Sequence, residues 1–287
     1  MINREAQLLE DAGYWRSWFG FRIIQKTRES SEITSFHLAP LDGKPLPSYL
    51  PGQYISIRTL VPDIHYLQAR QYSLGDAPYH DYYRFTIKKE HSLDLDDPNA
   101  KAHPGYILNI LHNERDVGDA VEVSHPAGNL FLDTRQQDSS DGPIVLISAG
   151  VGLTPDLSTF NTLIAKASKR RISWVHASRS PWVQAFRDHV KNIVNTHDNV
   201  QSHVFIREHG QDDVEGVDYH FTGRMSLNKL DTDHDIFIHD PRAEYYICGP
   251  ENLMADIARY LEGQGVESKR IKIEVFGTEE IPRPEQE

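Results

Sequence analysis

The stretch Ala69-Arg70-Gln71-Tyr72-Ser73-Leu74 decides how the rest of the chain is interpreted. An arginine presents a planar cationic fork that matches a pyrophosphate, and a tyrosine ring can lie against a flat aromatic system. The neighbouring serine hydroxyl can reach the edge of such a system. An Arg-x-Tyr-Ser run at the end of a strand therefore predicts a flavin dinucleotide site formed by Arg70, Gln71, Tyr72 and Ser73, although so short a run also occurs by chance.

A glycine-rich loop follows later, in Gly150-Val151-Gly152-Leu153-Thr154-Pro155. It lies between an apolar run, residues 144–147, and a segment with helical apolar spacing. The glycines allow a ligand to approach the backbone closely, and proline suits the first turn of a helix. A tight strand–helix turn without a ligand is the simpler alternative, but the position favours a nicotinamide dinucleotide.

Three further positions carry candidate cofactor contacts. Cys248-Gly249-Pro250 ends another apolar strand, where parallel sheets bind ligands, although a lone cysteine is commonly just a small buried residue. Arg179 follows the second strand of this region and can pair with the 2′-phosphate of NADPH, which tilts the cofactor prediction from NADH toward NADPH. A solvated surface arginine is the alternative. Lys88 either assists a pyrophosphate or is solvated.

The pattern of the chain changes near residue 140 and predicts two domains. Short β-rich segments with turn signals between them predict a small antiparallel six-stranded barrel, with strands at residues 21–24, 33–38, 54–58, 70–74, 83–88 and 120–124. Alternating segments then predict a parallel α/β lobe, with strands at 144–147, 172–176, 204–206, 244–247 and 271–276 and helices after the glycine-rich loop, at 182–194 and at 251–263. We expect an N-terminal helix and linker at 1–18, a flavin-binding β-barrel at 19–135 and a nicotinamide-binding α/β domain at 142–287.

The composition excludes several classes of protein. A net charge of -12 argues against nucleic-acid binding. One cysteine excludes an internal disulfide framework and a four-cysteine iron–sulfur cluster, and it fits a cytoplasmic protein. No apolar run approaches the roughly 18–20 residues of a membrane span, and the fifteen histidines show no metal-binding spacing. We expect a soluble monomer without a metal.

The order of these motifs resembles the ferredoxin-reductase superfamily and, within it, the reductase half of the flavohaemoglobins. The resemblance is carried by Ile2-Asn3-Arg4-Glu5-Ala6, Trp18-Phe19-Gly20-Phe21-Arg22, Glu32-Ile33-Thr34-Ser35-Phe36, Pro51-Gly52-Gln53-Tyr54, the Arg-Gln-Tyr-Ser run, Pro126-Ala127-Gly128, residues 146–152, Gly223-Arg224-Met225, the Cys-Gly-Pro run and Glu274-Val275-Phe276-Gly277. It covers the chain nearly from end to end.

The resemblance implies FAD and NADPH or NADH as cofactors, with hydride transfer to the flavin beside Ser73. Tyr54 would pack on the flavin, although a turn followed by an edge tyrosine is the simpler interpretation of its motif. The helix start at Gly105 would hold flavin phosphate with Leu108 and Asn109. Leu108 replaces the usual serine, so we expect weaker flavin retention. Polar residues 91–103 resemble an inserted surface loop.

The resemblance also assigns roles near the C-terminus. Phe276 would cover the flavin ring, and Glu274 would tune its electrostatics or supply protons. Gly277 belongs to the same contact. Val275 and Thr278 replace the usual cysteine and proline of the family, so ring packing is expected to differ. Cys248 would lie beside the nicotinamide as a steric group.

The resemblance leaves the electron acceptor open. In flavohaemoglobins the acceptor is an attached haem domain, and the reaction is oxidation of nitric oxide to nitrate. This sequence lacks the roughly 140 residues that a globin would occupy. We expect a separate haem protein or another acceptor. A fragment of a longer enzyme, a ferredoxin- or flavodoxin-type reductase, and a module that has lost its flavin stay as alternatives.

Overall fold

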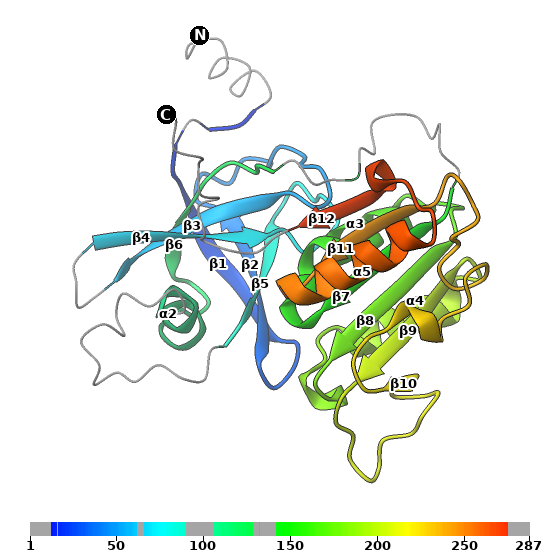
Figure 1. Ribbon diagram of the computed structural model, residues 1–287. Helices are drawn as coiled ribbons and strands as arrows, with labels where there is room; N and C mark the ends of the chain where they lie inside the picture. The colour runs from blue at the N-terminus through cyan, green and yellow to red at the C-terminus, as the bar shows by residue number, and fades with distance from the viewer. Residues whose placement is uncertain are drawn as a thin grey trace, which may run out of the picture.

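The computed structural model describes residues 13–15, 17–61, 66–89, 106–128, 132 and 142–274. The described chain forms two six-stranded sheets, one antiparallel and one parallel, which lie side by side (Figure 1). We call them the barrel and the α/β lobe. The expected N-terminal helix, the polar segment 135–141 between the two domains, and the insertion at 91–103 lie outside the described residues.

The barrel has all six predicted strands. Five are as long as or longer than predicted, and the sixth is one residue shorter. They are β1 (Phe19–Arg28), β2 (Ile33–Pro40), β3 (Tyr54–Val61), β4 (Tyr66–Ser73), β5 (Tyr83–Lys88) and β6 (Ala120–Val123), in the spatial order β4-β3-β6-β1-β2-β5. The two edges meet where Leu74 bridges Phe85 and the Gly75 amide donates to the Arg84 carbonyl at 2.8 Å. The sheet is thereby closed, and the expected antiparallel barrel is confirmed.

Alternation along the strands fills the inside of the barrel. In β1, Phe21 and Ile23 are fully buried, whereas Arg22 and Ile24 between them are exposed. This period of two places one face of each strand in the core. The helix α2 (Tyr106–Glu114) adds Ile110 and Leu111 to the same core.

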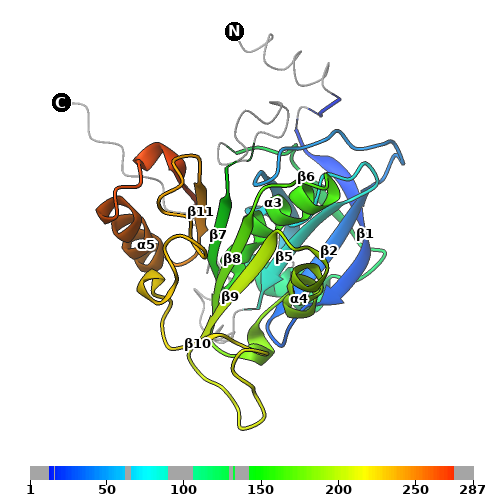
Figure 2. The same ribbon diagram turned by 90° about the vertical axis from the view of Figure 1, so that its right-hand side faces the viewer.

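The second sheet is parallel, as predicted. Its strands are β7 (Ile144–Ala149), β8 (Ile172–Ser178), β9 (Val200–Ile206), β10 (Phe221–Thr222), β11 (Glu244–Cys248) and β12 (Ile271–Glu274), in the order β10-β9-β8-β7-β11-β12. The helices α3 (Leu153–Ala165) and α4 (Arg187–Thr196) cover the face toward the barrel, and α5 (Glu251–Gly263) covers the other (Figure 2). Short 3-10 turns are Gly150–Gly152, Pro181–Val183, Leu227–Lys229 and Ser268–Arg270.

One local prediction was wrong, and one short strand was not predicted. Residues 182–194 do not form one helix, because Gln184 is extended and Phe186 adopts φ 58°, so that α4 begins at Arg187. The Phe186 ring is buried, and the guanidinium carbon of Arg84 from the barrel lies over it, 5.1 Å from the ring centroid. This contact between lobes overrides the helical pattern. The two-residue strand β10 has no periodic signal and was not predicted.

Two further features concern only the part of the chain that the structure describes. None of its helices is both long and apolar enough to cross a bilayer. Its His, Cys, Asp and Glu side chains form no group of three that could hold a metal ion.

Candidate functional site

Three of the predicted flavin motifs meet at one end of the barrel. Tyr54 pairs with Ser73 across β3 and β4, and it exchanges two backbone hydrogen bonds of 2.8 Å with Ala127. Gly128 follows with φ 121°, and a Cβ there would lie 3.2 Å from the Tyr54 ring. Glycine at this position therefore lets the ring lie against the backbone.

The other side chains of the Arg-Gln-Tyr-Ser run point in different directions. Arg70 is half-buried and donates to the carbonyl of Ala69 at 2.8 Å, and Gln71 is exposed. Tyr72 is turned into the barrel core, where its ring centroid lies 5.2 Å from that of Phe85. Only 6% of Tyr72 is exposed, so protein packs around the ring that was predicted to lie against the flavin.

Several buried polar atoms in this region have no hydrogen-bond partner among the described residues. They are the Ser73 hydroxyl, the Tyr72 hydroxyl and the Asn109 side-chain oxygen. Burial raises the pKa of Tyr72, so its hydroxyl keeps its proton at neutral pH. Because buried polar groups are almost always hydrogen-bonded, these atoms fit a ligand that brings both donors and acceptors. Gly105 and residues 275–278, which include Val275, Phe276, Gly277 and Thr278, lie outside the described residues.

The glycine-rich loop forms the predicted turn between β7 and α3. Gly150 has φ 56°, and the space around its missing side chain is open. A Cβ on Gly152 would lie 2.7 Å from the Cys248 carbonyl oxygen, so this loop and the Cys-Gly-Pro run are in direct contact. Thr154 closes the turn by donating to the Val151 carbonyl at 2.9 Å. The two predicted nicotinamide motifs are therefore adjacent.

Four polar side chains form one row across the carboxyl ends of the parallel strands. The strand registers place His176 beside Ser148, Ser148 beside Cys248, and Cys248 beside Glu274. Ser148 and His176 are joined by a hydrogen bond of 3.0 Å between Oγ and Nδ1. Burial lowers the pKa of His176 to about 4, so its imidazole is neutral near pH 7.

A carboxyl group that the sequence did not single out faces this row. Asp156 lies in the first turn of α3, is 2% exposed, and has a side-chain oxygen without a partner among the described residues. Burial, and next the nearby charge of Glu274, raise its pKa well above the ordinary range. Burial also raises the pKa of Glu274 to about 7, and burial together with both carboxyl groups raises that of Cys248. An aspartate on the apolar face of a helix is the signal that could have identified it.

The Asp156→Asn variant should become more stable than the wild type as the pH rises. A carboxyl whose pKa is raised by folding stays protonated while the unfolded chain ionises above 3.8, so it costs stability at higher pH. We expect the stability difference to grow as the pH rises from about 5 to about 8, by at most roughly 1.4 kcal/mol for each pH unit. Urea unfolding at both pH values measures it. Asp256→Asn, at an exposed carboxylate paired with Arg259, is the control, and a difference for Asp156→Asn that is equal at the two pH values would contradict the assignment.

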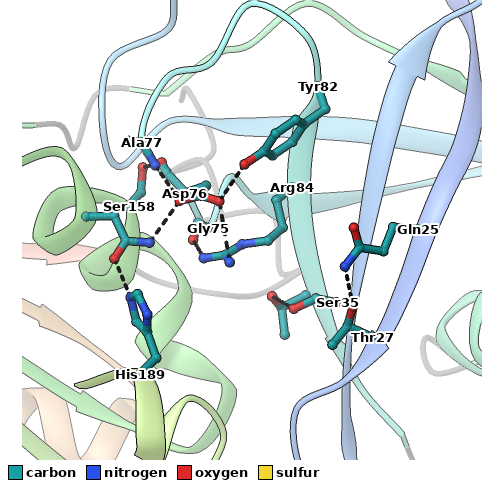
Figure 3. A network of polar contacts seen from close by, with 12 residues as sticks. Gln25, Thr27, Ser35, Gly75, Asp76, Ala77, Tyr82, Arg84, Ser158 and His189 are labelled. Carbon is teal, nitrogen blue, oxygen red and sulfur yellow. Dashed lines mark hydrogen bonds and ion pairs between the residues drawn. The ribbon is translucent and has the colours of Figure 1, made fainter. Parts of the chain in front are cut away.

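The two lobes are joined by a polar network centred on Asp76, three residues after Ser73 (Figure 3). One Asp76 carboxylate oxygen accepts from the Asn161 side chain of α3 at 2.9 Å, and the other lies 3.4 Å from the Arg84 guanidinium. The Asp76 carbonyl accepts from the Ser158 hydroxyl at 2.6 Å. His189 of α4 extends the network through a 2.8 Å contact with Asn161. Sequence patterns do not reveal this network, because its members are far apart in the chain.

The same contact joins the flavin and nicotinamide motifs. A Cβ on Gly75, two residues after Ser73, would lie 3.0 Å from the Thr154 side chain in the glycine-rich loop. The end of β4 thus lies directly against the start of α3.

Lys88 and Arg179, the two predicted phosphate contacts, share one partner. Lys88 Nζ lies 3.4 Å from one carboxylate oxygen of Glu32, and Arg179 hydrogen-bonds the other. Both cations are about half exposed, at 45% and 46% of their side chains. The sequence did not indicate that a barrel carboxylate would hold both.

The sequence and the fold are similar to those of known flavoproteins. Residues 146–259 match the oxidoreductase NAD-binding domain family. A flavohemoprotein from Bordetella pertussis is 42% identical over 284 residues, which cover 97% of this chain and 66% of that protein. The chain thus spans slightly less than two thirds of the length of this relative.

Two solved structures have the same architecture. The flavohem-like FAD/NAD binding domain of nitric oxide dioxygenase from Vibrio cholerae superposes with a TM-score of 0.76 and 33% identity, over 91% of this chain and 100% of that one. Flavohemoglobin from Malassezia yamatoensis, solved with bound FAD and heme, gives a TM-score of 0.76 and 25% identity, over 96% of this chain and 64% of that one. The chain therefore belongs to the flavohemoprotein family and corresponds to the reductase portion of its members.

Proposed function

We propose that this chain is an FAD-dependent NAD(P)H oxidoreductase that passes electrons to a separate haem protein or to a small acceptor. The observation that carries the proposal is the contact between Gly75 and Thr154. Gly75 follows the Arg-Gln-Tyr-Ser run and Thr154 belongs to the glycine-rich loop, so this contact supports a flavin and a nicotinamide bound close together. A hydride can move only between rings held in contact.

The barrel residues would hold the flavin. Arg70 is half-exposed, lies in β4 three residues before its last residue, and suits the pyrophosphate. Tyr54 offers its ring beside Ser73. The Ser73 hydroxyl is buried without a partner among the described residues and can donate to the redox-active edge. When bound, the flavin supplies the capacity to accept a hydride and to release its two electrons singly.

The α/β lobe would hold the dinucleotide. The start of α3, at Gly150–Gly152 and the following turn, suits its pyrophosphate, because a helix N-terminus favours an anion. Cys248 would act as a steric wall beside the nicotinamide rather than as a nucleophile, since burial raises the pKa of its thiol. Glu274 can store a proton, because its pKa of about 7 lies near the working pH.

The direct test is anaerobic titration of the purified chain, loaded with FAD, with NADH and with NADPH. The proposal expects the visible flavin bands to bleach with one of them and to return on addition of an acceptor. The acceptor panel holds a ferric globin, a ferredoxin, a flavodoxin and ferricyanide, so it separates a globin reductase from a ferredoxin- or flavodoxin-type reductase. Protein that is colourless and takes up no added FAD would be a module without flavin, and the proposal would fail.

Nitric oxide dioxygenation, the activity that names the Vibrio cholerae relative, would require a haem partner for this chain. The proposal therefore expects nitric oxide consumption only when an oxygen-binding globin is added to the reduced protein. A nitric oxide electrode measures the rate with and without the globin. Equal rates in both would contradict this assignment of the acceptor.

Leu108→Ser should retain flavin longer than Leu108→Ala. In the structure Leu108 packs against the barrel core at the start of α2, so both variants lose the same packing and differ only in the hydroxyl. A hydrogen bond to a charged phosphate is worth roughly 1.5–3 kcal/mol, so we expect flavin release to be at least about tenfold slower from the serine variant. Recovery of FAD fluorescence after dilution measures the off-rate. Equal off-rates would show that residue 108 does not contact the phosphate.

A further inference from the structure

The connection between β1 and β2 reaches from the barrel to the α/β lobe. Its Ser31 amide donates to the Trp182 carbonyl at 3.3 Å, and Ile33 is buried in the core of the α/β lobe. Both ribbon views place this connection beside the loop that follows β8 (Figures 1 and 2). Glu32 lies between these two contacts and is therefore held at the border of the two lobes.

The Glu32 carboxylate lies between two cations from different lobes. Arg179 of the α/β lobe hydrogen-bonds one oxygen, and Lys88 of β5 lies 3.4 Å from the other. Only 8% of the Glu32 side chain is exposed. Although burial opposes ionisation, the Arg179 hydrogen bond and the Lys88 charge lower the pKa of Glu32, so it is an anion at neutral pH.

The position of Arg179 gives this ion pair a consequence for cofactor choice. Arg179 directly follows β8, the second parallel strand along the chain. At this strand end, dinucleotide-binding sheets commonly use an acidic residue for the ribose 2′-hydroxyl of NADH, or a cation for the 2′-phosphate of NADPH. Here the strand end supplies the cation and the barrel supplies the acid.

We propose that Glu32 determines cofactor specificity by neutralising Arg179 and Lys88, so that the chain favours NADH over NADPH. The inference rests on the proposed function and deepens it. A 2′-phosphate would have to displace the Glu32 carboxylate or bind beside it, and like charges a few ångströms apart repel. Replacing this carboxylate with an amide of the same shape removes the repulsion and frees both cations.

The test compares two ligands that differ only in the 2′-phosphate, 5′-AMP and 2′,5′-ADP. Isothermal titration calorimetry on the full chain gives both dissociation constants for the wild type, Glu32→Gln and a control, Glu267→Gln. Glu267 is an exposed carboxylate that pairs with Lys269 on the surface. We expect Glu32→Gln to bind 2′,5′-ADP about tenfold more tightly than the wild type does, which corresponds to about 1.4 kcal/mol. Binding of 5′-AMP, and both constants of the control, should be unchanged.

A second pair of variants tests whether the effect passes through Arg179. In the Arg179→Gln background, Glu32→Gln should improve 2′,5′-ADP binding by a smaller factor than it does in the wild-type background, because Lys88 is then the one cation of the pair left to be freed. Thermal unfolding verifies that each variant is folded.

The outcomes separate this inference from the proposed function. An unchanged ratio of the two constants in Glu32→Gln, or an equal gain for both ligands, overturns the role of Glu32 and leaves the dinucleotide site standing. If the wild type binds neither ligand, the assignment of the dinucleotide site is contradicted, and so is the role of Glu32 that rests on it.

Discussion

Asp76→Ala should destabilise the protein by about 3–5 kcal/mol, because it leaves the Arg84 guanidinium buried without its counter-charge. The Arg84 side chain is 12% exposed, and its ion pair with Asp76 lies in the contact between the lobes. The Asn161 amide of α3 loses its acceptor in the same variant. Urea unfolding followed by circular dichroism measures the change.

Two matched variants assign this loss to the charge. Asp76→Asn keeps the shape and the neutral hydrogen bonds, so it should cost less, roughly 1–3 kcal/mol. Adding Arg84→Met to Asp76→Ala should recover part of the loss, because removal of both partners is less costly than removal of one. An Asp76→Ala midpoint within error of the wild type would show that the network does not hold the lobes together.

Gly152→Ala should reduce the rate of hydride transfer about a hundredfold or more, since a displacement of roughly 1 Å at the reacting groups has this effect. The new Cβ would lie 2.7 Å from the Cys248 carbonyl oxygen and 2.8 Å from the Gly249 Cα. Both are backbone atoms that cannot rotate away, so the glycine-rich loop and the Cys-Gly-Pro run must separate. Overpacking of this kind also costs about 1–3 kcal/mol of stability.

Gly150→Ala is the control for this steric argument. Gly150 has φ 56° and open space where its side chain would be, so alanine meets backbone strain but no clash. It should lower stability and weaken NADH binding, but at saturating NADH it should leave the nicotinamide-to-flavin rate within about a factor of ten, because the reacting groups are not displaced. Stopped-flow reduction of the FAD-loaded protein by NADH gives both rates. If Gly152→Ala retains the wild-type rate, hydride transfer does not depend on close contact between the glycine-rich loop and the Cys-Gly-Pro run.

Local patterns were sufficient for the architecture. Period-two alternation and turn residues predicted all six barrel strands, and the apolar run before Gly150 predicted the buried strand β7. These patterns are reliable because each strand buries one face or both, and the order of apolar and polar residues along the strand follows which face is buried. Where a contact between lobes competed, at Phe186, the local helical pattern failed.

The sequence by itself determined the two sheets and predicted that the Arg-Gln-Tyr-Ser run, the glycine-rich loop and the Cys-Gly-Pro run lie at strand ends, because each follows from a local pattern. Only the tertiary structure revealed Asp76, Asp156 and Glu32 as important groups. Each acts through a partner distant in the chain, since charge and burial depend on spatial neighbours rather than on sequence neighbours. The contact between the lobes brings Asp76 to Asn161 and Glu32 to Arg179.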